Sequence, residues 1–154
     1  MTLKAFYIRY SLWAAILNTL SIVVYLFVRN YANVWVLFVG NVLFSAVILM
    51  SVFKGNHRVH DTASVRSLFL MGLKVTIYGI LIAGVLCLLL LLINSFFTGL
   101  NSRDLPPQSG RGDVFFTILS NTIAVNAVLG ALAAVIGSSV VKRNQKTGEG
   151  KTLY

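Results

Sequence analysis

The chain has 154 residues, of which 57% are hydrophobic and only 11% are charged, and its mean hydropathy is +0.83. This composition excludes an ordinary soluble domain, in which about a quarter of the residues are charged, and it indicates an integral membrane protein. Lys and Arg outnumber Asp and Glu by 13 to 4, which gives a net charge of +9. The single cysteine, Cys87, excludes an intramolecular disulfide and any thiol-oxidising chemistry that needs exchanging cysteine pairs.

Four uncharged windows are long enough to cross a hydrocarbon core about 30 Å thick, which needs roughly 20 apolar residues per helix. They cover residues 10–28, 34–53, 75–97 and 114–141. Unbroken runs such as VLCLLLLLI at residues 85–93 are typical of membrane helices and not of alternating barrel strands. The sequence therefore predicts one all-α polytopic membrane domain over residues 1–154, with four transmembrane helices arranged as two antiparallel hairpins.

The connections favour this arrangement in chain order. The first apolar run is too long for a cleaved signal peptide, so we expect an uncleaved first helix. Residues 29–33 form a connection short enough to require an antiparallel hairpin. In the segment 54–67, Asp61, Thr62 or Ser64 is placed to cap a third helix that begins before the membrane.

The segment before the fourth helix, residues 98–113, is rich in Gly, Pro and Ser and is expected to be a loop outside the cytoplasm. Its last residue, Asp113, is placed to cap the fourth helix. Residues 111–113 also spell the adhesion tripeptide RGD, but three-residue matches are frequent by chance. Residues 142–154 form a basic tail whose composition is typical of disorder.

The basic residues predict the orientation. Ten Lys and Arg residues lie before the first window, between the second and third, or after the fourth, and three lie in the other two connections. Because cytoplasmic segments carry the excess of Lys and Arg, both termini are expected to be cytoplasmic. The same charges attract anionic lipid headgroups. They are scattered over short segments without a recognition module, so nucleic acid is not an expected partner.

The four windows contain no Asp, Glu or His. Ion-coupled carriers and membrane enzymes use such groups to bind ions and transfer protons, so we expect no catalytic residues and no cofactor. His57, His60 and Asp61 form the one cluster that suggests a metal site, yet a structural zinc site needs about four ligands. A solvated loop, in which histidine could sense cytoplasmic pH, is the simpler interpretation.

Small and polar residues at helical spacing predict faces along which helices approach closely. The predicted packing residues are Asn18, Asn41, Ser45, Gly72, Thr76, Gly79, Ala83, Asn121, Asn126, Gly130, Ala134 and Gly137. The sets from Gly72 to Ala83 and from Asn126 to Gly137 would form complementary faces of the third and fourth helices. An unpaired amide in hydrocarbon costs several kcal/mol, so the four asparagines are expected to turn inward and find partners. A polar cavity for a lipid headgroup or small solute is the alternative.

The segments NTIAVNAVLGALAAVIGSSVVKRNQK (residues 121–146) and RSLFLMGLKVTIYGILIAG (residues 66–84) permit a comparison with known families. Together they resemble an uncharacterised family of small four-helix bacterial inner-membrane proteins, classed only as a domain of unknown function. The resemblance covers roughly the second half of the chain. It implies the topology and a bacterial inner membrane, and no site residues, because the family has no established activity.

Two functions remain open at this level. The first is a non-enzymatic accessory or scaffold subunit that acts through helix packing, as a homo-oligomer or with other membrane proteins. The surplus of small-residue faces over the needs of one bundle favours this interpretation. The second is a small transporter or a flippase-like lipid carrier with a path lined by Asn18, Asn41 and Asn126.

Overall fold

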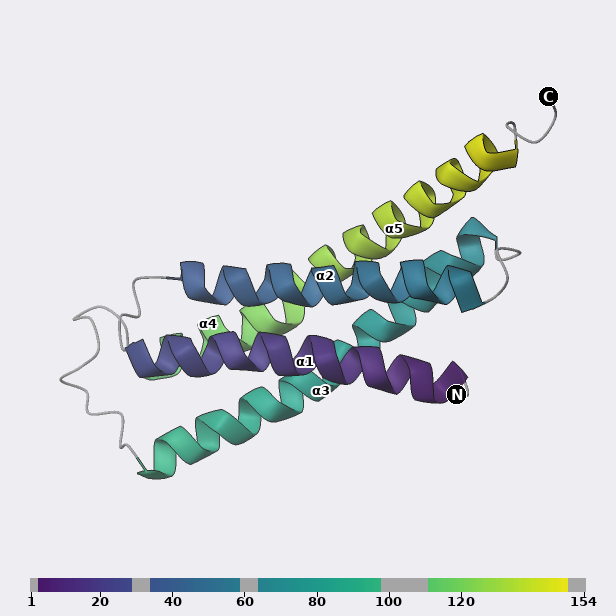
Figure 1. Cartoon of the computed structure of the whole chain (residues 1–154). Coiled ribbons are helices and arrows are strands. Elements are labelled where there is room, and N and C mark those ends of the chain that lie inside the picture. Colours follow the sequence, from purple (N-terminus) through teal and green to yellow (C-terminus); the bar gives the residue numbers. More distant parts are fainter. Residues whose placement is uncertain (1–2, 29–33, 59–63, 98–110, 150–154) are drawn as a thin grey trace.

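The computed structural model of the chain describes residues 3–28, 34–58, 64–97 and 111–149 (Figure 1). The elements in these ranges are all helical: α1 (Leu3–Val28), α2 (Trp35–Arg58), α3 (Val65–Phe97), α4 (Arg111–Ser120), a π-helical turn η1 (Asn121–Val125) and α5 (Asn126–Glu149). Because α4, η1 and α5 follow one another directly, they form a single span over Val114–Val141. Among the described residues, four helices are long and apolar enough to cross a membrane, which confirms the predicted fold class.

The helices are longer than the uncharged windows that predicted them. α1 begins at Leu3, α2 continues to Arg58, α3 begins at Val65, and α5 continues to Glu149. An α-helix satisfies its own backbone hydrogen bonds, so it can leave the hydrocarbon and continue among headgroups without a change of structure. The windows cover only the uncharged part of each helix. The first eight residues of the predicted tail, 142–149, accordingly continue α5.

The two predicted helix caps differ in outcome. The Oγ atom of Ser64 accepts a hydrogen bond from the backbone N–H of Ser67 at 3.1 Å, so Ser64 is the N-cap of α3 and that prediction is confirmed. The prediction that Asp113 caps the fourth helix is wrong, because α4 already begins at Arg111. The helix starts at the first residue of the RGD tripeptide, so residues 111–113, predicted as the end of the loop, form its first turn.

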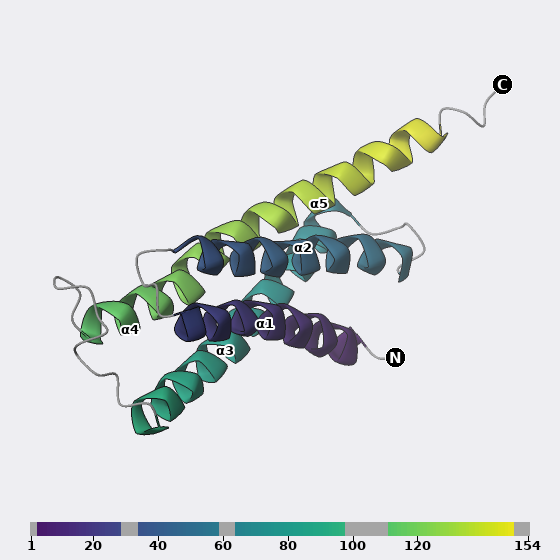
Figure 2. The ribbon, with the colours of Figure 1, turned by 60° about the vertical axis from the view of Figure 1, so that its left-hand side comes forward.

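The helices alternate in direction. α1 and α3 begin at one end of the bundle, and α2 and α4 begin at the other (Figure 1). α1 packs against α2 and α3, and α5 packs against the same two helices from the other side. α1 and α2 lie side by side, whereas α3 and the span ending in α5 cross them obliquely (Figure 2). α1 and α5 therefore occupy opposite sides of the bundle.

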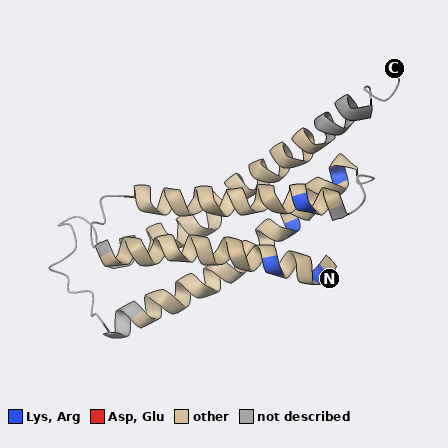
Figure 3. Ribbon diagram, in the orientation of Figure 1, with Lys and Arg blue, Asp and Glu red and all other residues tan. Residues whose placement is uncertain are grey.

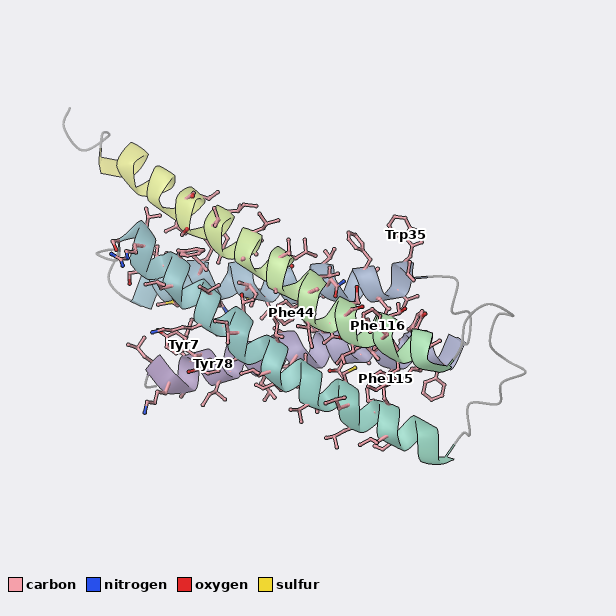
Figure 4. All side chains as sticks on the ribbon, turned by 180° about the vertical axis from the view of Figure 1, so that it is seen from behind. Tyr7, Trp35, Phe44, Tyr78, Phe115 and Phe116 are labelled. Carbon is pink, nitrogen blue, oxygen red and sulfur yellow. The ribbon has the colours of Figure 1, made fainter. Side chains whose placement is uncertain are left out.

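One end of the bundle is basic. α1 and α3 begin there, α2 and α5 end there, and it holds all the Lys and Arg residues whose surroundings the structure describes (Figure 3). These are Lys4, Arg9, Lys54, Arg66 and Lys74. We call this the basic end and the other the far end. At the far end, Trp35 and Phe116 project outward with exposed fractions of 71% and 72% (Figure 4), a placement typical of aromatic residues at a membrane interface.

Three apolar clusters fill the bundle at different depths. The far cluster contains Ile22, Tyr25, Leu37, Cys87, Leu91, Val114 and Ile118. The near cluster, closer to the basic end, contains Ala14, Phe44, Ile48, Val75, Ala133 and Ala134. The far and near clusters each draw residues from all four spans, and a third, smaller cluster contains Val52, Leu68 and Val141. Large aliphatic side chains outside the clusters are widely exposed, for example Leu81 and Val128 at 61% each, which suits a surface in contact with lipid tails.

Candidate functional site

Four asparagines form a polar layer between the far and near clusters. Asn126 on α5 donates an Nδ2 hydrogen to Oδ1 of Asn18 on α1 at 3.0 Å. Asn41 on α2 and Asn121 on η1 exchange two hydrogen bonds, at 2.9 Å from Asn41 Nδ2 and 3.3 Å from Asn121 Nδ2. We call these four residues the amide layer. Three of them, Asn18, Asn41 and Asn126, are completely buried.

The amide layer lies near the middle of the span. Asn18 is nine residues from Arg9 towards the basic end and nine residues from Phe27 towards the far end, which is roughly 13–14 Å in each direction at 1.5 Å per residue. A hydrocarbon core is about 30 Å thick. The amides therefore lie where lipid offers no hydrogen-bonding partner, and the interhelical pairs replace the water that they lose.

The π-helical turn explains how Asn121 and Asn126 both reach the interior. In a regular α-helix, residues five apart differ in direction by about 140°, because each residue turns the chain by about 100°. A π turn closes over one additional residue and brings residues five apart onto neighbouring directions. η1 begins at Asn121 and α5 begins at Asn126. The turn thus presents one amide to α2 and the other to α1.

Hydroxyl groups within the helices bond to the backbone of the amide layer. Ser21 Oγ donates to the carbonyl of Asn18 at 2.7 Å, and Ser45 Oγ donates to the carbonyl of Asn41 at 2.9 Å. Asn126 Nδ2 also donates to the Thr122 carbonyl at 3.0 Å. Ser45, predicted as a packing residue, thus bonds within α2 and does not bridge two helices.

Within the described ranges, three buried polar atoms of this region have no hydrogen-bond partner: Nδ2 of Asn18, Oγ1 of Thr19 and Oδ1 of Asn126. The Asn18–Asn126 pair is therefore joined by one hydrogen bond, whereas the Asn41–Asn121 pair has two. One spare donor and one spare acceptor remain on the two amides. This is the point of the amide layer with unused hydrogen-bonding capacity.

The predicted faces of the third and fourth helices meet at two positions. A Cβ atom on Gly72 would lie 2.7 Å from Cβ of Ala134, and a Cβ atom on Gly130 would overlap the side chain of Thr76. Thr76 Oγ1 donates to the Gly72 carbonyl at 2.9 Å, which ties its hydroxyl to α3. α3 and α5 therefore approach as closely as their glycines permit at these levels.

The other predicted glycines face α2. A Cβ atom on Gly79 would lie 3.0 Å from the ring of Phe44, and one on Gly137 would lie 3.3 Å from Leu49 and Val52. Ala83 is completely buried in α3. α2 therefore enters the space between α3 and α5, and the two predicted faces do not meet along their whole length.

Sequence reasoning missed two contacts of the site. Gly40 lies so close to α1 that a Cβ atom there would overlap the side chain of Ser21. Thr122 is completely buried, donates to the Ile118 carbonyl at 2.8 Å, and its side chain lies near Cys87 on α3. The first contact could have been predicted from the sequence, because Gly40 directly precedes Asn41 and a glycine permits close approach of a neighbouring helix. Thr122 carries no such signal without knowledge of the π turn.

Metal ligands are not gathered in the part of the chain that the structure describes, where no group of three His, Cys, Asp or Glu residues lies together. His57 is exposed at the end of α2. His60 and Asp61, the other two members of the suggested cluster, lie outside the described residues.

Comparisons with known proteins add no relative: no family model, no curated protein and no solved structure matches the chain. The resemblance to the small bacterial inner-membrane family therefore stays a prediction.

Proposed function

We propose that the chain is a non-enzymatic integral membrane protein that serves as an accessory or scaffold subunit through helix packing. The observation that carries this proposal is the closure of the amide layer. Its amides bond to one another, and the far and near clusters cover it on both sides with buried apolar side chains. An interior arranged in this way holds helices together and gives the protein a rigid outer surface.

The proposed membrane is the bacterial inner membrane, with both termini in the cytoplasm. The gathering of described Lys and Arg side chains at one end supports the orientation, because basic segments remain on the cytoplasmic side. The resemblance of the second half of the chain to a bacterial family supports the location.

The partners are proposed to meet the exposed aliphatic surface, as other membrane proteins or as further copies of this chain. Gly72, Thr76, Gly130 and Ala134 pack within the bundle, so they are not available for a partner. On the outer side of α5, Val128, Leu132 and Val135 have exposed fractions of 61%, 51% and 47%. They lie on neighbouring turns and form a continuous ridge.

Photo-crosslinking in living cells tests the scaffold proposal. A photoreactive amino acid is placed at Val128 or Leu132 and, as the matched control on another helix, at Leu81 of α3, which is equally exposed. The proposal predicts a discrete protein adduct from the α5 positions and only lipid adducts from Leu81. Lipid adducts alone at every position, together with a monomer in native mass spectrometry, would contradict it.

A second function, a small transporter or flippase-like carrier, is favoured by one observation. The spare donor of Asn18 and the spare acceptor of Asn126 could bind a polar solute in the middle of the span. Proteoliposomes decide between the two functions through movement of a fluorescent phosphatidylcholine and of glycerol. If the wild-type chain moves either probe and a folded Asn126→Leu variant does not, the carrier replaces the scaffold as the better proposal.

A further inference from the structure

Lys74 has a specific place on the outside of the bundle. It lies on α3, it is exposed, and its Nζ atom is 5.8 Å from the centre of the Tyr7 ring on α1. α1 and α3 are neighbours at this level, since Ser11 Oγ donates to the Val75 carbonyl at 3.0 Å. The lysine side chain therefore extends across the outer seam between α1 and α3.

Further polar groups border the same seam. Lys4 is exposed one turn before Tyr7, and Tyr78 is 48% exposed one turn after Lys74, so each lies on the same side of its helix as its neighbour. Figure 4 shows Tyr7 and Tyr78 on α1 and α3 in the half of the bundle nearer the basic end. Arg66 is exposed two turns before Lys74. None of the side chains that the structure describes is acidic (Figure 3).

The depth of Lys74 matches the boundary of the hydrocarbon. From Lys74 to Ile93, where the apolar span ends, the helix advances 19 residues, which is roughly 28 Å at 1.5 Å per residue. This length is close to the thickness of a hydrocarbon core. Lys74 therefore lies where lipid phosphates begin, and the tyrosines lie at the depth that phenol rings favour.

We propose that Lys74, Tyr7, Tyr78 and Lys4 form a binding site for the headgroup phosphate of an anionic phospholipid. The ammonium groups bind phosphate oxygens as point charges, and the phenol hydroxyls can donate hydrogen bonds to them. Further along the outer side of α3, Ile77, Leu81 and Val85 are at least half exposed and offer an apolar surface to the acyl chains. Lys4 and Arg66 repel the ammonium group of a zwitterionic lipid, so the site selects lipids with a net negative charge.

Native mass spectrometry of the full-length chain, released from nanodiscs of phosphatidylglycerol and phosphatidylethanolamine, tests the proposal. The wild type is expected to retain phosphatidylglycerol preferentially. Lys74→Gln should weaken this retention about ten-fold, the effect of losing one hydrogen bond to a charged group. Lys54→Gln, which removes an exposed lysine of α2 at the same basic end, is the matched control and should leave retention unchanged.

Four results would overturn the proposal. Equal losses in Lys74→Gln and Lys54→Gln would show diffuse attraction without a site, and equal retention of phosphatidylethanolamine would remove the selectivity. Displacement of the lipid by inorganic phosphate at millimolar concentration would identify the site as one for a soluble anion. Lys74→Arg keeps the charge and the aromatic contact and should retain the lipid. If it loses the lipid as Lys74→Gln does, while circular dichroism shows a folded protein, the charge is not the cause and the proposal fails.

Discussion

Asn126 on α5 donates one amide hydrogen to Oδ1 of Asn18 on α1 at 3.0 Å, and this bond joins two helices on opposite sides of the bundle. Asn126→Leu removes the bond and leaves the whole Asn18 amide without a partner among apolar neighbours. We expect a loss of about 1–3 kcal/mol in the free energy of unfolding, measured by titration with a denaturing detergent in mixed micelles.

A double variant of Asn18 and Asn126 separates the cost of an unpaired buried amide from the contribution of the hydrogen bond to stability. When Asn18→Leu accompanies Asn126→Leu, no amide of the pair is left to desolvate, so the double variant should be more stable than Asn126→Leu alone. An interhelical bond in a membrane contributes only about 0.6 kcal/mol, so the free energy of unfolding of the double variant should stay below that of the wild type by this amount. Additive losses in the two single variants would refute this account of the pair.

The two glycines Gly130 and Gly84 should respond to alanine in opposite directions. At Gly130 a new methyl group overlaps Thr76, so Gly130→Ala is expected to destabilise the fold by about 1–3 kcal/mol. At Gly84 a Cβ atom meets no atom within 4 Å, so Gly84→Ala should be neutral or stabilise by up to about 1 kcal/mol through helix propensity. Thermal unfolding in one detergent compares them directly. A destabilised Gly84→Ala would mean that an unrecognised partner covers this face.

The number of spans and the inward position of the asparagines follow from simple physics in the sequence. Length and hydropathy decide the first, and the desolvation cost of an amide decides the second. The pairing of Asn41 with Asn121 and of Asn18 with Asn126 was not predictable in the same way. It depends on which helices are neighbours, and an amide can bond equally well to any other amide.

The π turn also lay beyond sequence reasoning. The regular spacing from Asn126 to Gly137 predicted one face correctly as a set of inward residues, but the same period turns Asn121 away from it. The irregular turn is stable because both amides have hydrogen-bond partners in the tertiary structure. Likewise, Gly79 and Gly137 face α2 because a glycine face accepts whichever helix lies closest.

The π turn predicts a specific response to deletion of Ala124, an exposed residue of η1. Removal of one residue should restore a regular α-helix in which Asn121 and Asn126 are four residues apart, and residues four apart lie on the same face of an α-helix. In a Cys87→Ser background, oxidation should crosslink Asn41→Cys to Asn121→Cys in membranes, and this crosslink should persist in the deletion variant. The pair Asn18→Cys and Asn126→Cys is the control, because α5 keeps its position. Loss of the first crosslink alone would show that the additional residue is needed to direct Asn121 towards α2.

The closed interior predicts that Cys87 is unreactive in the folded protein. Its side chain is completely buried in the far cluster and lies near Thr122, next to the amide layer. Thiols react with maleimides as thiolates, which form where water is present, so a water-filled path through the layer would expose Cys87 to the reagent. A water-soluble maleimide should therefore label the wild-type chain in native membranes only after denaturation. His57→Cys in a Cys87→Ser background, exposed at the basic end, should be labelled at once in inverted vesicles, where the cytoplasmic side faces out. Labelling of native Cys87 at a comparable rate would place water beside the asparagines and favour the carrier over the scaffold.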